Sequence, residues 1–268
     1  MKTIFITGAS TGLGRATAIL FANNGWKVIA TMRNPDKETE LAAVANITLM
    51  QLDVTNAKQV VDVAAKALAM GDVDVVFNNA GYGLIGPLEG ITDEQVTRQL
   101  NTNLLGVIRV TKEFIPAFRA RKSGMFITTT SIGGHVTYPF GSMYHATKWA
   151  LEGWSESLSF ELGSYGIGVK TVSPGGIATD FIGRSMDMGK HEAYDAAVQK
   201  LFQVYSNPAY AVNRSTAEQI AAIVYEAATD GKDQLRYVAG IDANIMYERR
   251  IAEGPETFRK NTRATFMD

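Results

Sequence analysis

The chain has 268 residues, of which 46% are hydrophobic and 20% charged, which is enough apolar material for one packed α/β domain. Lys and Arg number 26 and Asp and Glu 27, so the net charge of −1 offers no basic footprint for nucleic acid or an anionic membrane. With no cysteine and only three histidines, thiolate chemistry and disulfides are excluded, and we expect no metal site. No apolar run has the roughly 18 residues of a membrane helix, so a cytoplasmic protein is expected.

Short apolar runs alternate with helix-length segments along most of the chain. The expected strands are Thr3–Thr7, Lys27–Met32, Ile47–Leu52, Val73–Phe77, Met125–Thr130, Gly168–Val172 and Leu235–Ala239. Helices are expected at Arg15–Asn24, Thr55–Ala69, Asp93–Arg121 (bent or broken by Pro116), around Tyr144, and at Thr216–Thr229. Such alternation predicts parallel pairing, so the fold class is α/β with a doubly wound sheet.

The alternation fails between Gly176 and about Asn213. Methionine and aromatic residues occur there among polar ones, and we expect a long irregular insertion. A mixed tail to Asp268 follows the last strand.

Glycine is concentrated in the turn after the first strand, which reads Thr7-Gly-Ala-Ser-Thr-Gly-Leu-Gly14. Glycines there allow a tight path and let backbone N–H groups approach a pyrophosphate at a helix N-terminus. The spacing is G-x-x-x-G-x-G, which differs from the G-x-G-x-x-G of the standard fingerprint. Tight turns also use glycine for steric reasons alone, so the position directly after strand one is what favours a phosphate site.

The end of the second strand discriminates between nucleotides. An acidic residue there suits the ribose 2′-OH, whereas arginine suits a 2′-phosphate. Arg33 follows the strand and no carboxylate occurs before Asp36. The sequence therefore favours NADP(H) over NAD(H), the alternative being that Arg33 is a solvated loop residue.

Tyr144 and Lys148 are four residues apart in a helix-compatible segment, so they share one helix face. Ser131 follows a strand, and the three polar groups could meet at one place. Taken alone, such a pair is more often the edge of an amphipathic helix, and a serine there often ends a strand. Glu152, one turn beyond Lys148, could pair with it and weaken its effect on Tyr144. His145 is expected to point away from Tyr144.

Six features occur in order: TGASTGLG, Asp53, NNAG ending at Gly81, Ser131, Tyr144-x-x-x-Lys148 and Pro174-Gly175. Together they resemble the short-chain dehydrogenase/reductase family, in its compact single-domain branch, over roughly residues 3–240. The resemblance implies a Rossmann-type sheet of about seven strands, bound NADP(H), and reversible hydride transfer between a carbonyl and an alcohol. It also implies one catalytic domain over residues 1–268.

The resemblance further implies the roles of individual residues. The catalytic set would be Ser131, Tyr144 as general acid/base, Lys148 and an asparagine, for which Asn103 fits the family pattern better than Asn101. Lys148 would lower the pKa of Tyr144. Cofactor contacts would come from Gly8, Ser10, Thr11, Gly12, Leu13, Gly14, Arg33, Asp53, Val54, Asn79, Ala80, Gly81, Tyr144, Lys148, Pro174, Gly175, Ile177 and Thr179.

The segment at about 180–213 is interpreted as a substrate lid. Phe181, Ile182, Met186 and Met188 give it an apolar surface that suits an apolar carbonyl or alcohol substrate, and its alternative role is a helical cover on the core. Tyr138, Pro139 and Phe140 are candidates for the opposite wall of the pocket.

Large apolar residues such as Trp149, Trp154 and Phe160 continue along the helix that carries Tyr144, and relatives of this kind are commonly dimers or tetramers. We therefore expect a homo-dimer or homo-tetramer. The competing functional class is a catalytically silent NADP(H)-binding sensor or interaction protein.

Overall fold

The structure is a computed structural model that describes residues 1–178, 185–207 and 213–268. Within these ranges the main sheet has seven parallel strands in the order β3-β2-β1-β4-β6-β7-β9. They are β1 Thr3–Thr7, β2 Lys27–Met32, β3 Ile47–Gln51, β4 Val75–Asn78, β6 Gly124–Thr129, β7 Ile167–Pro174 and β9 Arg236–Ala239. The predicted doubly wound, Rossmann-type sheet is confirmed, with strand ends that differ from the prediction by a few residues.

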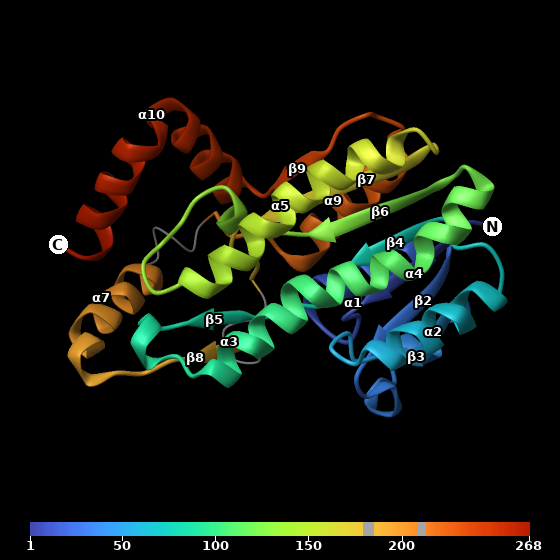
Figure 1. The fold of residues 1–268 in the computed structure, drawn as a ribbon, viewed down its shortest axis with the longest axis horizontal. Helices are drawn as coiled ribbons and strands as arrows, with labels where there is room; N and C mark the ends of the chain where they lie inside the picture. The colour runs from blue at the N-terminus through green and yellow to red at the C-terminus, as the bar shows by residue number, and fades with distance from the viewer. Residues whose placement is uncertain (179–184, 208–212) are drawn as a thin grey trace.

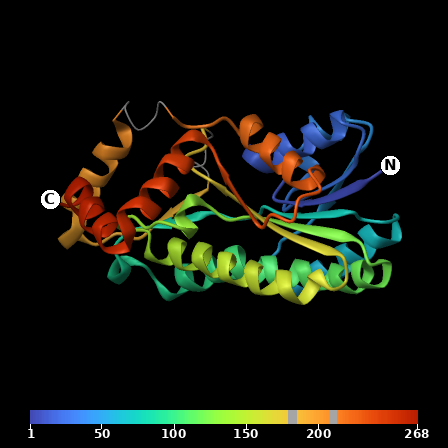
Figure 2. The same ribbon diagram turned by 90° about the horizontal axis from the view of Figure 1, so that it is seen from above.

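Helices cover both faces of the sheet (Figures 1 and 2). One face carries α1 (Gly12–Asn23) and α9 (Ala217–Thr229), and the other carries α2 (Ala57–Ala69), α4 (Gly106–Arg121) and α5 (Ser142–Gly163). Alternate residues of each central strand supply the two cores: Ile4 and Ile6 pack with α1 and α9, whereas Phe5 packs with α2 and α4. This is why the strand sequences are apolar throughout rather than alternating.

The predicted long helix is divided by a turn that the sequence did not indicate. Helix α3 (Asp93–Leu100) passes through a π-helical turn at Asn101–Leu105 into α4. The prediction of a break at Pro116 is wrong, because α4 continues through it to Arg121. Phe114 and Phe118, on either side of the proline, are fully buried against the sheet, and this packing holds the helix despite the missing N–H.

The segment after Gly176 is more regular than predicted. The strand β8 (Met186–Met188) pairs in parallel with β5 (Gly83–Ile85), and α7 (Asp195–Ser206) follows. The tail is also helical, because α10 runs from Ile241 to Phe266. It is broken at Gly254, which has a φ of 73° and directly precedes Pro255. Helices α7 and α10 lie together at one end of the molecule (Figure 1). The prediction of a mixed tail is therefore corrected, and so is that of an irregular insertion over residues 185–207; residues 179–184 and 208–212 of that insertion lie outside the described ranges.

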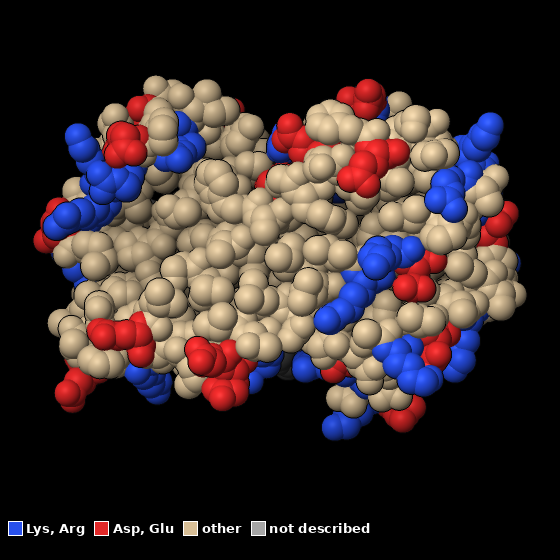
Figure 3. Space-filling view, in the orientation of Figure 1, with Lys and Arg blue, Asp and Glu red and all other residues tan. Residues whose placement is uncertain are grey.

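The surface formed by α3, α4 and α5 faces the viewer in Figures 1 and 3. Its left and central parts are largely uncharged, and most charged side chains gather toward its margins (Figure 3). Among the helices of the described ranges, none combines the length and the apolar composition needed to cross a membrane.

Candidate active site

The predicted site residues converge because four neighbouring strands end at one edge of the sheet. Strands β1, β4, β6 and β7 are adjacent and parallel, so their carboxyl ends share that edge. The glycine-rich turn follows β1, the NNAG segment spans the end of β4, Ser131 follows β6, and Pro174 ends β7. In open α/β sheets, ligands bind outside this edge, at the point where the strand order reverses. Here that point lies between β1 and β4.

The glycine-rich turn is shaped so that side chains would not fit. Gly8 has a φ of 68°, and a Cβ on it would lie 2.8 Å from the Ala80 Cα. A Cβ on Gly14 would lie 2.3 Å from the Gly8 carbonyl oxygen. Gly8 is thus needed for the close approach of the NNAG segment to the turn, and Gly14 for the close approach of α1.

The start of α1 fits an anionic group. Thr11 is its N-cap but makes no side-chain capping hydrogen bond, and the first helical turn contains no acidic residue. Gly12 begins the helix with a φ of 52°. The first N–H groups of the helix and the positive end of its dipole therefore suit a phosphate.

Asn79 joins the glycine-rich turn to the end of β4. Its side-chain amide donates to the carbonyl oxygens of Thr7 (3.2 Å) and Gly8 (3.1 Å), and its side-chain oxygen accepts from the Thr129 hydroxyl at 3.3 Å. The asparagine therefore connects the carboxyl ends of β1, β4 and β6.

The residues expected near adenosine lie at the ends of β2 and β3. Arg33 directly follows β2 and is exposed. A second arginine in this region, Arg15 on α1, is already paired with Glu38 at 3.3 Å and also with Glu40. Asp53 accepts hydrogen bonds from the Thr55 N–H and hydroxyl at 2.9 and 2.7 Å. Val54 is buried and packs against Gly106 at the start of α4.

The segment after β7 is held by the start of α10. The N–H of Gly176 donates to the Asp242 carboxylate at 2.6 Å, and a Cβ on Gly175 would lie 2.3 Å from the same carboxylate. Ile177 forms an isolated bridge with Ser215. Thr179 lies outside the described residues.

Lys148 is buried below the expected reaction centre. The residue is only 7% exposed, and its Nζ donates a hydrogen bond to the Thr129 carbonyl oxygen at 2.9 Å. Burial lowers the pKa of Lys148 to about 8, although the negative charge of Glu152 opposes this change. Nζ lies 5.8 Å from the centre of the Tyr144 ring, so the phenol and the ammonium share one region, as their spacing predicted.

Tyr144 differs from expectation in its ionisation. Burial raises the pKa of its phenol, and the interaction with the Ser131 hydroxyl only partly offsets this. The expected net lowering of this pKa by Lys148 is therefore wrong, because desolvation dominates. The phenol is held in its neutral form, which is the form that can donate a proton.

Ser131 begins a short 3-10 turn, Ile132–Gly134. Its backbone is extended, and its hydroxyl oxygen accepts a hydrogen bond from the Gly133 N–H at 3.0 Å. The serine thus caps the turn, as one interpretation of the sequence allowed, and also interacts with Tyr144.

Asn103 and Asn101 are distinguished by the π-helical turn. Asn103 is 1% exposed, and its side chain exchanges hydrogen bonds with the Tyr82 backbone, accepting at 3.0 Å and donating at 2.8 Å. It also approaches the hydroxyl of Thr147, on the helix that carries Tyr144, at 3.4 Å. Asn101 instead lies within 3.5 Å of Arg109. Asn103 thus contacts the helix that carries Tyr144, whereas Asn101 contacts α4.

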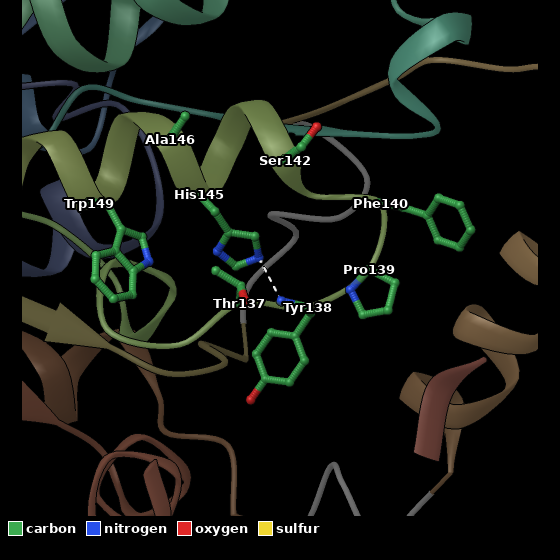
Figure 4. Close-up of a pocket in the computed structure, with 8 residues that line it drawn as sticks. All are labelled: Thr137, Tyr138, Pro139, Phe140, Ser142, His145, Ala146 and Trp149. Carbon is green, nitrogen blue, oxygen red and sulfur yellow. Dashed lines mark hydrogen bonds between the residues drawn. The ribbon is translucent and has the colours of Figure 1, made fainter. Parts of the chain in front are cut away.

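His145 has a structural environment. Its Nδ1 lies 2.8 Å from the Gly133 carbonyl oxygen, and its Nε2 accepts from the Tyr138 N–H at 3.0 Å (Figure 4). Burial lowers the pKa of its imidazole, so it remains neutral. The histidine therefore anchors the segment between Ser131 and Tyr144.

The residues expected as a wall of the substrate pocket line an open hollow of about 540 Å³. Tyr138, Pro139 and Phe140 form it together with Thr137, Ser142, His145, Ala146 and Trp149 (Figure 4). Ser131, Tyr144 and Lys148 are not among its lining residues, but the centre of the His145 ring lies 5.8 Å from that of Tyr144. The wall opposite the phenol therefore stays a prediction.

Several supporting residues were missed from the sequence. The Thr7 hydroxyl holds the backbone of Asn79, and the Thr129 carbonyl oxygen holds the Lys148 ammonium. The backbone of Tyr82 holds the Asn103 side chain. The one available signal was position, because Thr7 and Thr129 each end a strand at the active edge. A hydrogen bond to a backbone carbonyl oxygen cannot be predicted from the type of the residue that supplies it.

A family model described as short chain dehydrogenase matches residues 2–190. An uncharacterised oxidoreductase of Schizosaccharomyces pombe is 41% identical over 212 residues, covering 78% of this chain and 88% of that protein. The 17-beta-hydroxysteroid dehydrogenase type 1 of Homo sapiens is 31% identical over 250 residues, covering 87% of this chain and 76% of that protein.

Solved structures share the fold over nearly the full chain. A short-chain dehydrogenase from Streptomyces avermitilis superposes with a TM-score of 0.84 at 31% identity, covering 94% of each chain. ElxO with NADP bound superposes with a TM-score of 0.77 at 26% identity, covering 92% of this chain and 99% of that chain.

Proposed function

Because the chain belongs to the short-chain dehydrogenase family and is an oxidoreductase of that family, we propose that it uses NADP(H) to interconvert a carbonyl and an alcohol. The observation that carries this proposal is the grouping of Ser131, Tyr144 and the buried Lys148 beside the glycine-rich turn. We further propose that residues 1–268 act as one catalytic domain.

The nucleotide fits the cradle formed by the turn, the start of α1 and the NNAG segment. The phosphates would be held by the glycine-rich turn, at Gly8, Ser10, Thr11, Gly12, Leu13 and Gly14. The adenosine side would contact Asp53, Val54, Asn79, Ala80 and Gly81. The nicotinamide side would contact Pro174, Gly175, Ile177 and Thr179. When bound, the nicotinamide supplies or accepts the hydride.

The side chains of this protein would manage the proton and the oxygen. In the reductive direction, Tyr144 donates its phenolic proton to the substrate oxygen, and Ser131 donates a hydrogen bond to that oxygen. The Lys148 ammonium stabilises the resulting phenolate. Asn103, which is bonded to the Tyr82 backbone and approaches Thr147 on α5, would support a water leading from Lys148 to solvent.

We propose NADP(H) rather than NAD(H) because Arg33 is exposed directly after β2, where it suits a 2′-phosphate. Arg15 is less suited, because Glu38 and Glu40 already neutralise it. The binding of NADP by the structural neighbour ElxO is in line with this preference.

The proposed substrate is a ketone or secondary alcohol with apolar bulk. Met186 and Met188 are half-buried in β8, which lies beside β5 just after the NNAG segment. Phe181 and Ile182 of the proposed lid lie outside the described residues. The human relative is named for a hydroxysteroid, a large apolar alcohol, and this supports the same substrate class here.

We also propose that the protein assembles as a homo-dimer or homo-tetramer. On α5, Phe160 is 76% and Trp149 44% exposed. The left and central parts of the face formed by α3, α4 and α5 are largely uncharged (Figure 3). An apolar helix face of this kind is expected to be covered by a partner.

The test is NADPH consumption over a panel of apolar ketones and aldehydes, with Tyr144→Phe as the variant. We expect turnover by the wild type and a loss on the order of 10²–10⁴-fold in kcat for the variant, with NADPH affinity retained. Tyr165→Phe, an exposed tyrosine just beyond α5, is the matched control and should keep full activity. Tight NADPH binding without turnover of any panel member would instead identify a sensor, and full turnover by Tyr144→Phe would remove Tyr144 as the acid.

A further inference from the structure

Glu152 is a buried carboxylate one helical turn beyond Lys148, and the proposed reaction does not use it. The residue is 4% exposed. One carboxylate oxygen accepts from the Ser173 hydroxyl at 3.0 Å and lies 3.3 Å from the His135 Nε2. The other accepts from the Thr171 hydroxyl and from the Arg236 Nε, both at 3.2 Å. Its partners thus come from β7, β9 and the 3-10 turn after Ser131.

This network reaches the backbone that forms the active edge. The Ser173 hydroxyl lies 2.8 Å from the Thr130 hydroxyl, which also donates to the Val172 carbonyl oxygen at 3.2 Å. Thr130 stands between Thr129, whose carbonyl oxygen accepts from Lys148, and Ser131. Glu152 is therefore connected, through two hydroxyl groups, to the segment that holds the ammonium and the serine.

The 3-10 turn is also packed tightly onto α5 at this point. A Cβ on Gly134 would lie 2.9 Å from the Lys148 carbonyl oxygen and 3.1 Å from the Glu152 Cγ. Only glycine allows the turn to approach both residues, so the positions of Ser131, Lys148 and Glu152 are set together.

Basic and acidic side chains both lie near the Glu152 carboxylate. Arg236 from β9 and His135 from the turn face its carboxylate, and Lys148 lies one turn away on the same helix. Glu156, the next residue along that helix face, also binds Arg236. Burial alone would raise the pKa of Glu152, but the interactions with His135, Thr130 and Ser173 outweigh it, and the pKa lies below its ordinary value. The carboxylate is therefore ionised at neutral pH.

A buried anion near a buried amine favours the protonated amine. Lys148 has lost most of its hydration, and the nearby negative charge of Glu152 is what counteracts this loss. We propose that Glu152 is a positioning residue whose ionised carboxylate keeps Lys148 an ammonium, and whose hydrogen-bond network fixes the Thr129–Ser131 backbone. The catalytic consequence of this role rests on the proposed function. The effect of Glu152 on the protonation of Lys148 does not.

The sign of the effect is specific. Replacing Glu152 by Gln removes the charge but keeps the size, so Lys148 should lose its proton at lower pH. Replacing Arg236 by Gln removes the cation that neutralises Glu152, so Lys148 should keep its proton to higher pH. Glu156→Gln is the matched control, because it removes an equally charged residue that also binds Arg236 but lies one turn further from Lys148.

The experiment follows the Lys148 Cε resonance by NMR in protein labelled with ¹³C-lysine, assigned by its absence in Lys148→Arg. We expect a pKa for Lys148 about one unit lower in Glu152→Gln, higher in Arg236→Gln, and unchanged in Glu156→Gln. If Glu152→Gln does not fold, the upward shift in Arg236→Gln still tests the proposal. Equal pKa values in wild type and every folded variant among these would overturn it.

The kinetic arm uses the same variants. The alkaline limb of the pH profile for carbonyl reduction should move down in Glu152→Gln and up in Arg236→Gln, with kcat affected more than KM. Shifts in the NMR pKa without any turnover by the wild type would uphold the role of Glu152 and refute the proposed function. If the wild type turns over substrate but the NMR titrations and the kinetic pH profiles are the same in all variants, the proposed function is upheld and the role of Glu152 is refuted.

Discussion

The Thr7 hydroxyl oxygen accepts a hydrogen bond from the backbone N–H of Asn79 at 2.9 Å, although 72 residues separate the two in sequence. The same oxygen accepts from the Ala80 N–H at 3.0 Å. One buried hydroxyl thus satisfies two N–H groups of the NNAG segment and fixes it to the end of β1. Together with the Asn79 side chain, this hydroxyl holds the floor of the proposed nucleotide site.

Thr7→Val should therefore weaken both the fold and the cradle. Valine keeps the shape but leaves two N–H groups without an acceptor, so the free energy of unfolding should fall by about 1–3 kcal/mol. NADPH affinity should fall as well, because the NNAG segment then keeps only the bonds of the Asn79 side chain. Chemical denaturation and NADPH titration measure the two effects. Thr7→Ser retains the hydroxyl and should behave nearly as the wild type; equal losses in both variants would assign the effect to packing.

Arg33→Asp should change the preference between cofactors. Replacing the guanidinium by a carboxylate repels a 2′-phosphate and can accept from a 2′-OH, so the ratio of NADPH to NADH affinity should fall by about tenfold or more. The measurement is direct titration with each nucleotide. Lys37→Asp makes the same charge change at another exposed position nearby and should leave the ratio intact. An unchanged ratio in Arg33→Asp would show that another residue selects the phosphate.

Asp230 should contribute to stability in a defined pH range. It accepts from the buried Lys170 ammonium at 2.7 Å and from the Tyr237 hydroxyl at 2.6 Å. Although burial opposes ionisation, these bonds lower the pKa of Asp230 from 3.8 to about 2. A carboxyl whose folded pKa lies below its unfolded value stabilises the fold above that unfolded value and loses this effect as the pH falls toward the folded pKa.

The Tm difference between wild type and Asp230→Asn should accordingly be constant above about pH 4 and shrink between pH 4 and 2. Thermal unfolding over a pH series measures this. Asp233→Asn, in the exposed loop before β9, should show no such difference at any pH. A difference for Asp230→Asn that persists unchanged to pH 2 would contradict the lowered pKa.

The strands were predictable because each is a short apolar run that must be buried on both sides, as Ile4, Phe5 and Ile6 are. The break at Pro116 was predicted wrongly because local propensity was outweighed by the burial of Phe114 and Phe118. Helices α7 and α10 were missed because their sequences mix polar and apolar residues. Helix α10 packs on β9 and on α7, and such contacts between distant segments leave no local pattern.

The site was predictable where its geometry is local. The spacing of Tyr144 and Lys148 on one helix face needed no tertiary information, and the choice of Asn103 over Asn101 agrees with its burial. Glu152 was interpreted as a partner of Lys148, but its hydrogen bonds go to Thr171, Ser173 and Arg236 on other elements. Contacts between distant segments set its role, and these are invisible in a single sequence.

Arg236 lies 84 residues after Glu152, on β9, the last strand of the sheet in chain order. At roughly 5–20 residues per second, a ribosome needs roughly 4–17 s to add that stretch after Glu152 has been made. During this interval α5 and β7 can pack around a carboxylate that still lacks its guanidinium. Until β9 joins the sheet, the Glu152 carboxylate lacks the Arg236 guanidinium, and the surroundings of the Lys148 amine are incomplete.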